Sequence, residues 1–199
     1  MKSQPKRTPA RNLKPNKMDF DAFSSGQVIS KLWLAQELEP IARIHAAPAR
    51  IVLVGGWYGL LNLILKVRSN MSIESVRSID IDADACSVAD KLNDTWVWQN
   101  WKFKSINSDA NDYDYADSNL VINTSVEHID TQQWFDNIPN GCLVALQSND
   151  MDHEDHCHNH ESLDDFKNDF ALSEFFYSGS KHFEYPDWGF NRFMIVGKK

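Results

Sequence analysis

The chain has 199 residues, which at about 150 residues per domain predicts one domain. Hydrophobic residues make up 42% of it, so it can bury a core, and disorder throughout is excluded. The net charge is −8, but the first 17 residues hold six basic residues and no acid, which leaves a net −14 on 18–199. Such an acidic body argues against a large phosphate-binding face, so a nucleic-acid partner is not expected.

Residues 1–17 are interpreted as a disordered basic tail, either a solvated terminus or a tether to an acidic partner, and 18–199 as one domain. The three cysteines form no CxxC pair, which fits a reducing compartment rather than a disulfide framework. No apolar run reaches the ~18–20 residues of a membrane span, and the first 20 residues contain no hydrophobic signal segment. We therefore expect a cytoplasmic protein without membrane contact. The sequence does not predict its oligomeric state.

A capping pattern and helical spacing predict the first element. Ser24 is followed three residues later by Gln27, and apolar residues then recur at helical intervals, which predicts a helix over 25–39. Pro40 is expected to break this helix or kink it into a last turn at 41–45. The next predicted elements are a strand over 50–54, a helix over 60–67, a strand over 75–81 and a helix over 83–93.

The second half of the chain continues the alternation. Residues 101–106 are predicted as a strand because Trp101, Phe103 and Ser105 alternate with their neighbours at a period of two. The remaining predicted elements are a strand over 119–123, a helix over 131–138, a strand over 142–147, a helix over 163–170, and strands over 173–179 and 192–196. Strands that alternate with helices in this way predict an α/β fold with a doubly wound, mostly parallel sheet.

Polar residues and glycines follow the predicted strands. In doubly wound sheets, ligands bind at the carboxyl ends of the strands. Gly55, Gly56 and Gly59 follow the first strand, where glycines let the backbone approach a ligand closely. Asp80 stands 21 residues after Gly59, at the end of the second strand, where an acid can accept both hydroxyls of a ribose. Asp109 follows the third strand, where an adenine amino group can donate to it.

These strand ends resemble those of the class I S-adenosylmethionine-dependent methyltransferases. The matching positions are the turn over 55–59, Asp80, Asp109 and the pair Glu127-His128 after the fourth strand. The resemblance covers about 25–199 and implies a Rossmann-like seven-stranded sheet in the order 3-2-1-4-5-7-6, with the last strand antiparallel. The chain departs from the family pattern at Trp57, which replaces the middle glycine of the turn.

The resemblance implies S-adenosylmethionine as the cofactor and methyl transfer to a small-molecule or side-chain acceptor. The residues expected to contact the cofactor are Gln27, Lys31, Gly55, Gly56, Trp57, Tyr58, Gly59, Asp80, Ile81, Asp109, Ala110, Asn123, Thr124 and Ser125. His128 is the candidate general base, with Tyr58 and Asn123 as candidate orienting groups. The first helix is expected to lie over the pocket, with Gln27 or Lys31 near the methionine end of the cofactor.

Several alternatives stay open at this point. Trp57 in the glycine turn motivates other chemistry on the same cofactor, namely aminocarboxypropyl transfer or cleavage of the sulfonium. A catalytically silent binding protein of the same fold is another interpretation. The strand-end carboxylates can also be ordinary solvated groups, and Glu127-His128 an acid at a helix N-terminus beside a surface histidine. A dinucleotide enzyme is disfavoured because the glycines do not match G-x-G-x-x-G. DNA methylation is disfavoured because the segment over 123–126 lacks proline.

A histidine-rich segment follows the fifth predicted strand. Residues 149–165 hold four histidines, Cys157 and seven acids, which are side chains that bind zinc or nickel. However, His156, Cys157 and His158 are adjacent, and neighbours in an extended loop point to opposite sides. We therefore expect no bound metal and predict a lid over the acceptor. A solvated polar loop and a metal site are the alternatives.

Overall fold

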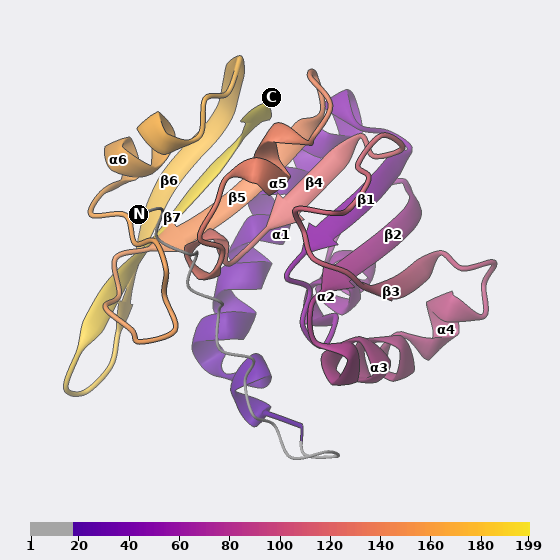
Figure 1. Ribbon diagram of the computed structural model, residues 1–199, viewed down its shortest axis with the longest axis horizontal. Helices are drawn as coiled ribbons and strands as arrows, with labels where there is room; N and C mark the ends of the chain where they lie inside the picture. Colours follow the sequence, from indigo (N-terminus) through magenta and orange to yellow (C-terminus); the bar gives the residue numbers. More distant parts are fainter. Residues whose placement is uncertain (1–17) are drawn as a thin grey trace, which may run out of the picture.

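The computed structural model describes residues 18–199 and places seven strands in one sheet (Figure 1). In chain order the strands are β1 (Ala49–Val54), β2 (Ile73–Asp80), β3 (Phe103–Asn107), β4 (Leu120–Asn123), β5 (Leu143–Asn149), β6 (Glu174–Glu184) and β7 (Gly189–Lys198). Their order across the sheet is β3-β2-β1-β4-β5-β7-β6. β1 to β5 pair in parallel, whereas β7 is antiparallel to both β5 and β6. The expected sheet order is confirmed; the tail predicted over 1–17 lies outside the described residues.

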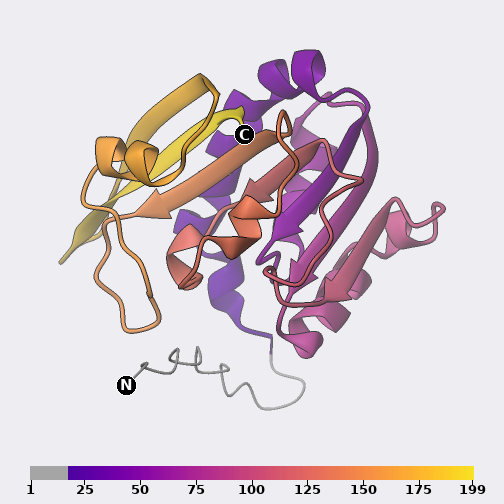
Figure 2. The ribbon, with the colours of Figure 1, turned by 45° about the horizontal axis from the view of Figure 1, so that its top comes forward.

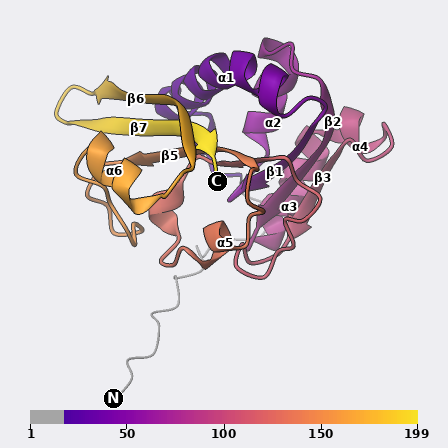
Figure 3. The same ribbon diagram turned by 90° about the horizontal axis from the view of Figure 1, so that it is seen from above.

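Helices cover both faces of the sheet (Figure 3). The described residues form the 3-10 helices η1 (Phe20–Phe23) and η2 (Val126–His128) and the α-helices α1 (Ser25–His45), α2 (Leu60–Arg68), α3 (Ala83–Leu92), α4 (Asp94–Val97), α5 (Gln133–Asp136) and α6 (Leu163–Asp169). α1, α2 and α3 pack into one apolar cluster, and α5 and α6 into another. Within residues 18–199, no helix combines the length and the apolar composition needed to cross a membrane.

The central strand β1 is buried on both sides, as expected for a parallel sheet. Ile51 and Leu53 belong to the cluster beneath α1, α2 and α3, whereas Val52 and Val54 belong to the cluster beneath α5 and α6. Each of these side chains is at most 4% exposed. Burial of a side chain of this size contributes roughly 1.5–3 kcal/mol. β1 is therefore held firmly from both faces, and so is the turn that follows it.

α1 continues through Pro40 to His45, so of the two outcomes expected at the proline, a break or a kink, the break does not occur. Proline removes one backbone hydrogen bond, the one that its N–H would donate to the carbonyl of Gln36. Both Gln36 and Pro40 are exposed, so that carbonyl lies on the side of the helix that faces water. Buried residues anchor the helix to the sheet on both sides of the proline, Leu34 and Leu38 before it and Ala42 after it.

Two predicted elements have different bounds in the structure. The strand predicted over 101–106 begins only at Phe103, because Trp101 adopts a left-handed φ of 56° in the preceding turn. The helix predicted over 131–138 shrinks to the four residues of α5. Pro139 accounts for its early end, since proline disfavours helical backbone in the residue before it. The sequence also did not predict α4, η1 or η2.

The C-terminal hairpin is longer than predicted. β6 and β7 extend well beyond the expected ranges 173–179 and 192–196, and their tip projects from the end of the sheet (Figures 1 and 2). Stacked aromatic rings hold this extension together. The ring of Phe190 lies 5.2 Å from that of Phe183 and 6.4 Å from that of Tyr185. Stacking of this kind adds to apolar burial and supports strands that leave the sheet.

The turn after β1 packs tightly against β2. The N–H of Gly56 donates to the carbonyl of Ile79 at 3.0 Å. A Cβ atom at Gly56 would lie 1.9 Å from the Oγ of Ser78 and 3.2 Å from its Cβ. Only glycine therefore fits at this position in the observed backbone.

Gly56→Ala is expected to destabilise the protein by about 1–3 kcal/mol, the usual cost of overpacking a close contact. Ser78→Ala should be nearly neutral, because the buried Ser78 Oγ has no hydrogen-bond partner. The double variant should recover part of the loss, since the closest clash is removed. The free energies of unfolding in urea give the measurement. An equal loss for Gly56→Ala in both backgrounds would contradict this account of the contact.

Candidate functional site

A cavity of about 600 Å³ opens at the carboxyl ends of the parallel strands. It is lined by the turn after β1, the end of β2, residues 108–111 after β3, and the segments after β4 and β5. η1, the start of α1 and the loop after β5 lie at this edge of the sheet (Figure 1). The volume falls within the roughly 300–1,000 Å³ typical of small-molecule sites.

Most residues that the sequence predicted for the site line this one cavity. They are Gln27, Lys31, Gly55, Gly56, Trp57, Tyr58, Asp80, Ile81, Asp109, Ala110, Thr124, Ser125 and His128. The structure does not bring Gly59 or Asn123 to the cavity wall. Gly59 precedes α2 with a left-handed φ of 71°. Asn123 is fully buried, and its Oδ1 accepts from the N–H of Ser125 at 2.9 Å, so it shapes the turn after β4.

Asp80 connects the glycine turn to the end of β2. Its Oδ2 accepts from the N–H of Trp57 at 2.8 Å, and its Oδ1 accepts from the N–H of Asp82 at 2.9 Å. Burial raises the pKa of the Asp80 carboxyl, whereas these backbone donors lower it. A carboxylate offers about four lone-pair sites, so Asp80 can still accept further hydrogen bonds from a ligand in the cavity.

Trp57 takes the backbone conformation that favours glycine. Its φ is 47°, in the left-handed region that L side chains rarely adopt. Its ring stacks on that of Tyr58, with centroids 5.1 Å apart. The hydroxyl of Tyr58 accepts from the N–H of Asp19 at 3.0 Å, which ties the turn to the residue before η1. Tyr58 is only 2% exposed and lines the cavity.

Asp109 is held within its own loop. Its Oδ1 accepts from the backbone N–H of Asn111 at 2.8 Å and from the Asn111 side chain at 3.0 Å. The neighbouring carbonyl of Ala110 accepts from the Tyr115 hydroxyl at 2.9 Å. These bonds fix the loop after β3, so Asp109 and Ala110 form a pre-organised part of the cavity wall.

Beyond the turn, the cavity is lined by a buried polar group centred on Glu127. Glu127 is 1% exposed, and its Oε1 accepts from Asn149 Nδ2 at 2.5 Å. Nη2 of Arg192 lies 3.8 Å from the same oxygen, and its Nη1 donates to the carbonyl of Thr124 at 3.0 Å. The second oxygen, Oε2, is buried without a hydrogen-bond partner. A carboxylate that is buried in this way is costly unless a ligand satisfies it.

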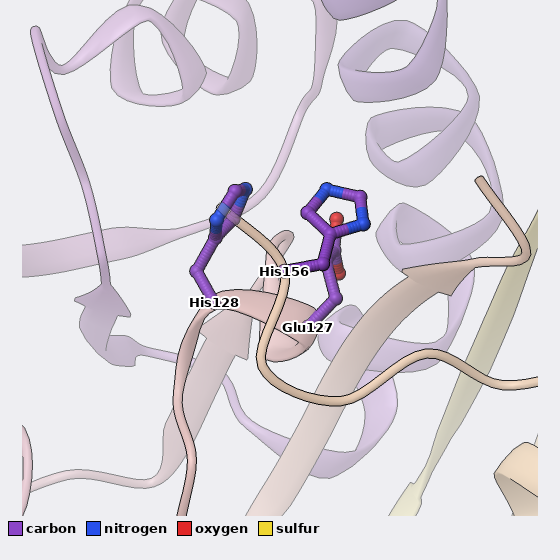
Figure 4. A group of neighbouring side chains, drawn as sticks. All are labelled: Glu127, His128 and His156. Atoms are coloured by element: carbon purple, nitrogen blue, oxygen red, sulfur yellow. The ribbon is translucent and has the colours of Figure 1, made fainter. Parts of the chain in front are cut away.

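The histidine-rich loop is pinned to η2 and divides its side chains between two places. The carbonyl of Glu127 accepts from the N–H groups of Cys157 and His158 at 2.8 and 3.2 Å. His156 faces the cavity beside His128, with ring centroids 4.8 Å apart (Figure 4). His158 instead bonds Asp169 at the end of α6, at 2.8 Å. In an extended loop, residues two positions apart would lie on the same side, so the separation of His156 and His158 shows that the loop is not extended here; it bends at Cys157.

Lys31 lies near the Glu127 group on the first part of α1. Burial lowers the pKa of its ammonium to about 7, and the nearby Arg192 lowers it as well, against the carboxylates of Glu127 and Asp21. Its Nζ donates to Gln27 Oε1 at 2.5 Å. Burial also lowers the pKa of His128 below its ordinary value. The lowered pKa of each group favours its neutral nitrogen, and for Lys31 the neutral amine is a substantial fraction near pH 7.

Sequence reasoning missed several residues of this wall. Arg192 belongs to β7 and Asn149 ends β5, far from the glycine turn along the chain. No motif marks either of them. Asp21 in η1 also lines the cavity, although the sequence predicts no element there. The sequence does mark Glu127, as part of a Glu-His pair, and His156, as part of a histidine cluster. Nothing in the sequence indicates that these two side chains meet.

No protein-family model matches the chain, and no curated protein matches it either. Solved structures match it by fold. N-methyltransferase NodS from Bradyrhizobium japonicum WM9 aligns with a TM-score of 0.63 and 12% identity, over 88% of this chain and 100% of that chain. The same enzyme in complex with S-adenosyl-l-homocysteine gives a TM-score of 0.60 and 14% identity, over 83% and 85%. Magnesium protoporphyrin IX methyltransferase (ChlM) from Synechocystis PCC 6803 with bound SAM gives 0.57 and 12%, over 86% and 79%. The chain therefore has the fold of the class I S-adenosylmethionine-dependent methyltransferases.

Lys31→Met is expected to stabilise the protein more at pH 6.5 than at pH 9. The folded protein binds the Lys31 proton with a pKa of about 7, against the ordinary 10.5. The cost of burying the charge is therefore complete below pH 7 and disappears as the pH rises from 7 towards 10.5. Urea unfolding at both pH values measures the difference, with the exposed Lys91→Met as the matched control. A stabilisation that grows with pH would contradict the shifted pKa.

Proposed function

We propose that the protein is an S-adenosylmethionine-dependent methyltransferase that acts on a small-molecule or side-chain acceptor. The observation that carries the proposal is one cavity with two chemically different halves. The first half holds the glycine turn, Asp80 and Asp109 and would take the cofactor. The second half holds His128, Lys31 and the Glu127 group and would take the acceptor.

The first half suits a nucleoside. The two backbone donors on Asp80 approach from the protein side and leave acceptor capacity for two ribose hydroxyls. Gly55 and Gly56 leave the backbone open for close approach of a ligand. NodS and ChlM, which share the fold, were solved with S-adenosyl-l-homocysteine and SAM respectively. These observations support S-adenosylmethionine as the cofactor.

The second half suits a small acceptor. η1, the start of α1 and the loop after β5 all line the cavity, whose volume of about 600 Å³ suits a small molecule or a single side chain beside the cofactor. The sulfonium already activates the methyl group, so the protein has to align the acceptor and, for some acceptors, remove a proton. Lys31 and His128 line this half and are the candidates to receive that proton.

Other chemistry on the same cofactor would use the same first half. Aminocarboxypropyl transfer and sulfonium cleavage both release methylthioadenosine, whereas methyl transfer releases S-adenosylhomocysteine. Incubation with labelled cofactor and a panel of small amine and hydroxyl acceptors, followed by product chromatography, distinguishes them. We expect S-adenosylhomocysteine. If methylthioadenosine is the enzyme-dependent product, the reaction is one of these two and not methyl transfer. If no acceptor gives a product, a catalytically silent binding protein is favoured.

Asp80→Asn is expected to weaken S-adenosylmethionine binding at least tenfold. The change removes the charge that strengthens the hydrogen bonds from the ribose, and each such bond contributes roughly 1.5–3 kcal/mol. Calorimetry measures the affinity. Asparagine keeps one oxygen as an acceptor for the turn, and circular dichroism checks that the fold persists.

Asp164→Asn is the matched control, because Asp164 is an exposed acid in the first turn of α6 and does not line the cavity. Its affinity for the cofactor should equal that of the unmodified protein. Unchanged affinity of a folded Asp80→Asn variant would remove Asp80 from the cofactor site.

A further inference from the structure

We propose that Glu127, His128 and His156 bind one divalent transition-metal ion in the acceptor half of the cavity. One ligand atom from each of these side chains lies within 4.8 Å of the other two. In Figure 4 the three side chains project to the same side of the two segments that carry them, η2 and the loop after β5. Two imidazoles and one carboxylate form a set that suits zinc and its neighbours in the first transition row.

The first supporting observation is the state of the Glu127 carboxylate. Its Oε1 already bonds Asn149, but the buried Oε2 has no hydrogen-bond partner. Glu127 is 1% exposed, so water does not compensate for the missing bond from outside. An unsatisfied carboxylate oxygen in the wall of a cavity is the acceptor that a cation would complete.

The second observation is the orientation of the two imidazole rings. Nδ1 of His128 lies 3.1 Å from the carbonyl of Asp155, and Nδ1 of His156 lies 2.9 Å from the carbonyl of Met151. A carbonyl oxygen only accepts, so each Nδ1 must carry the proton in these bonds. The neutral ring then keeps its lone pair on Nε2. Metal-binding histidines are oriented in this manner, by donating the other ring N–H to a carbonyl.

The geometry leaves room for an ion. Ligands bound about 2.1 Å from a tetrahedral zinc ion lie about 3.4 Å apart, so the present spread of up to 4.8 Å has to contract by up to about 1.4 Å. The loop after β5 can supply that shift, because His156 belongs to it. Three protein ligands leave a coordination position open. All three line the cavity, so that position would be available to a lone pair of the acceptor; this role rests on the proposed function. With Nε2 of His128 on the ion, Lys31 is left as the group that would receive the acceptor's proton.

A second histidine cluster provides the internal control. His158 and His160 lie 2.8 and 3.1 Å from the same Oδ2 of Asp169. Nδ1 of His160 lies 2.6 Å from the Ser148 hydroxyl. The nitrogens and the oxygen of this cluster therefore satisfy one another, whereas Glu127 Oε2 is left without a partner. We assign the metal to the first cluster for this reason.

Metal binding is tested without S-adenosylmethionine, so the result does not depend on whether the chain transfers methyl groups. Untagged full-length protein is stripped with a chelator and titrated with Zn²⁺ by calorimetry and with Co²⁺ by visible absorption. We expect one equivalent of each ion, with a Co²⁺ spectrum typical of nitrogen and oxygen ligands. Glu127→Gln and His156→Ala should each weaken Zn²⁺ binding at least tenfold, while His158→Ala should retain it.

The controls keep the proposal open to refutation. Circular dichroism and the melting temperature of the metal-free variants establish that each one folds; His156 lies in a surface loop, so His156→Ala tests the site even if Glu127→Gln does not fold. Absence of stoichiometric Zn²⁺ binding by the unmodified protein would overturn the proposal. Loss of binding in His158→Ala together with retention in His156→Ala would also overturn it and assign the ion to the Asp169 cluster.

Discussion

The close contact between the turn after β1 and the end of β2 is the constraint on which the site depends. Because Gly56 has no Cβ, the turn lies directly on Ser78, and the N–H of Trp57 reaches the carboxylate of Asp80. The same turn positions the Tyr58 hydroxyl to accept from Asp19, at the entry to η1. This one close contact thus fixes the backbone of the turn, the orientation of the Asp80 carboxylate and the hydrogen bond between Tyr58 and Asp19.

The two halves of the cavity are built by different means. Residues of the first half lie at the ends of β1, β2 and β3, where backbone N–H groups donate to the carboxylates of Asp80 and Asp109. The second half joins η2 to the loop after β5 and to β7, through Asn149, Arg192 and the carbonyl of Glu127. A polar group assembled from distant segments is stable only when each member finds a partner. Oε2 of Glu127 has no hydrogen-bond partner, so it is the atom that most clearly indicates a ligand at this site.

The loop after β5 differs from the extended segment that the sequence argument assumed. The chain bends at Cys157, so His156 and His158, which are two positions apart, face different places instead of the same side. The expectation that the loop binds no metal considered only ligands within the loop. The structure brings Glu127 and His128 to His156 from another segment, which changes the set of ligands to be considered. The prediction that the loop binds no metal stays untested, and we propose instead that His156 binds an ion together with Glu127 and His128.

The sequence by itself determined the sheet and most of the residues that line the first half of the cavity. Apolar runs, capping residues and the polar residues after each strand act locally, so periodicity and spacing predict them, and strand order followed from the family resemblance. Local patterns do not report competition between distant segments. Packing on both sides of Pro40 keeps α1 continuous, aromatic stacking lengthens β6 and β7, and the carbonyl of Glu127 pins the histidine-rich loop. Contacts between residues far apart in the chain decided these features, because their free energy arises only once the sheet has formed.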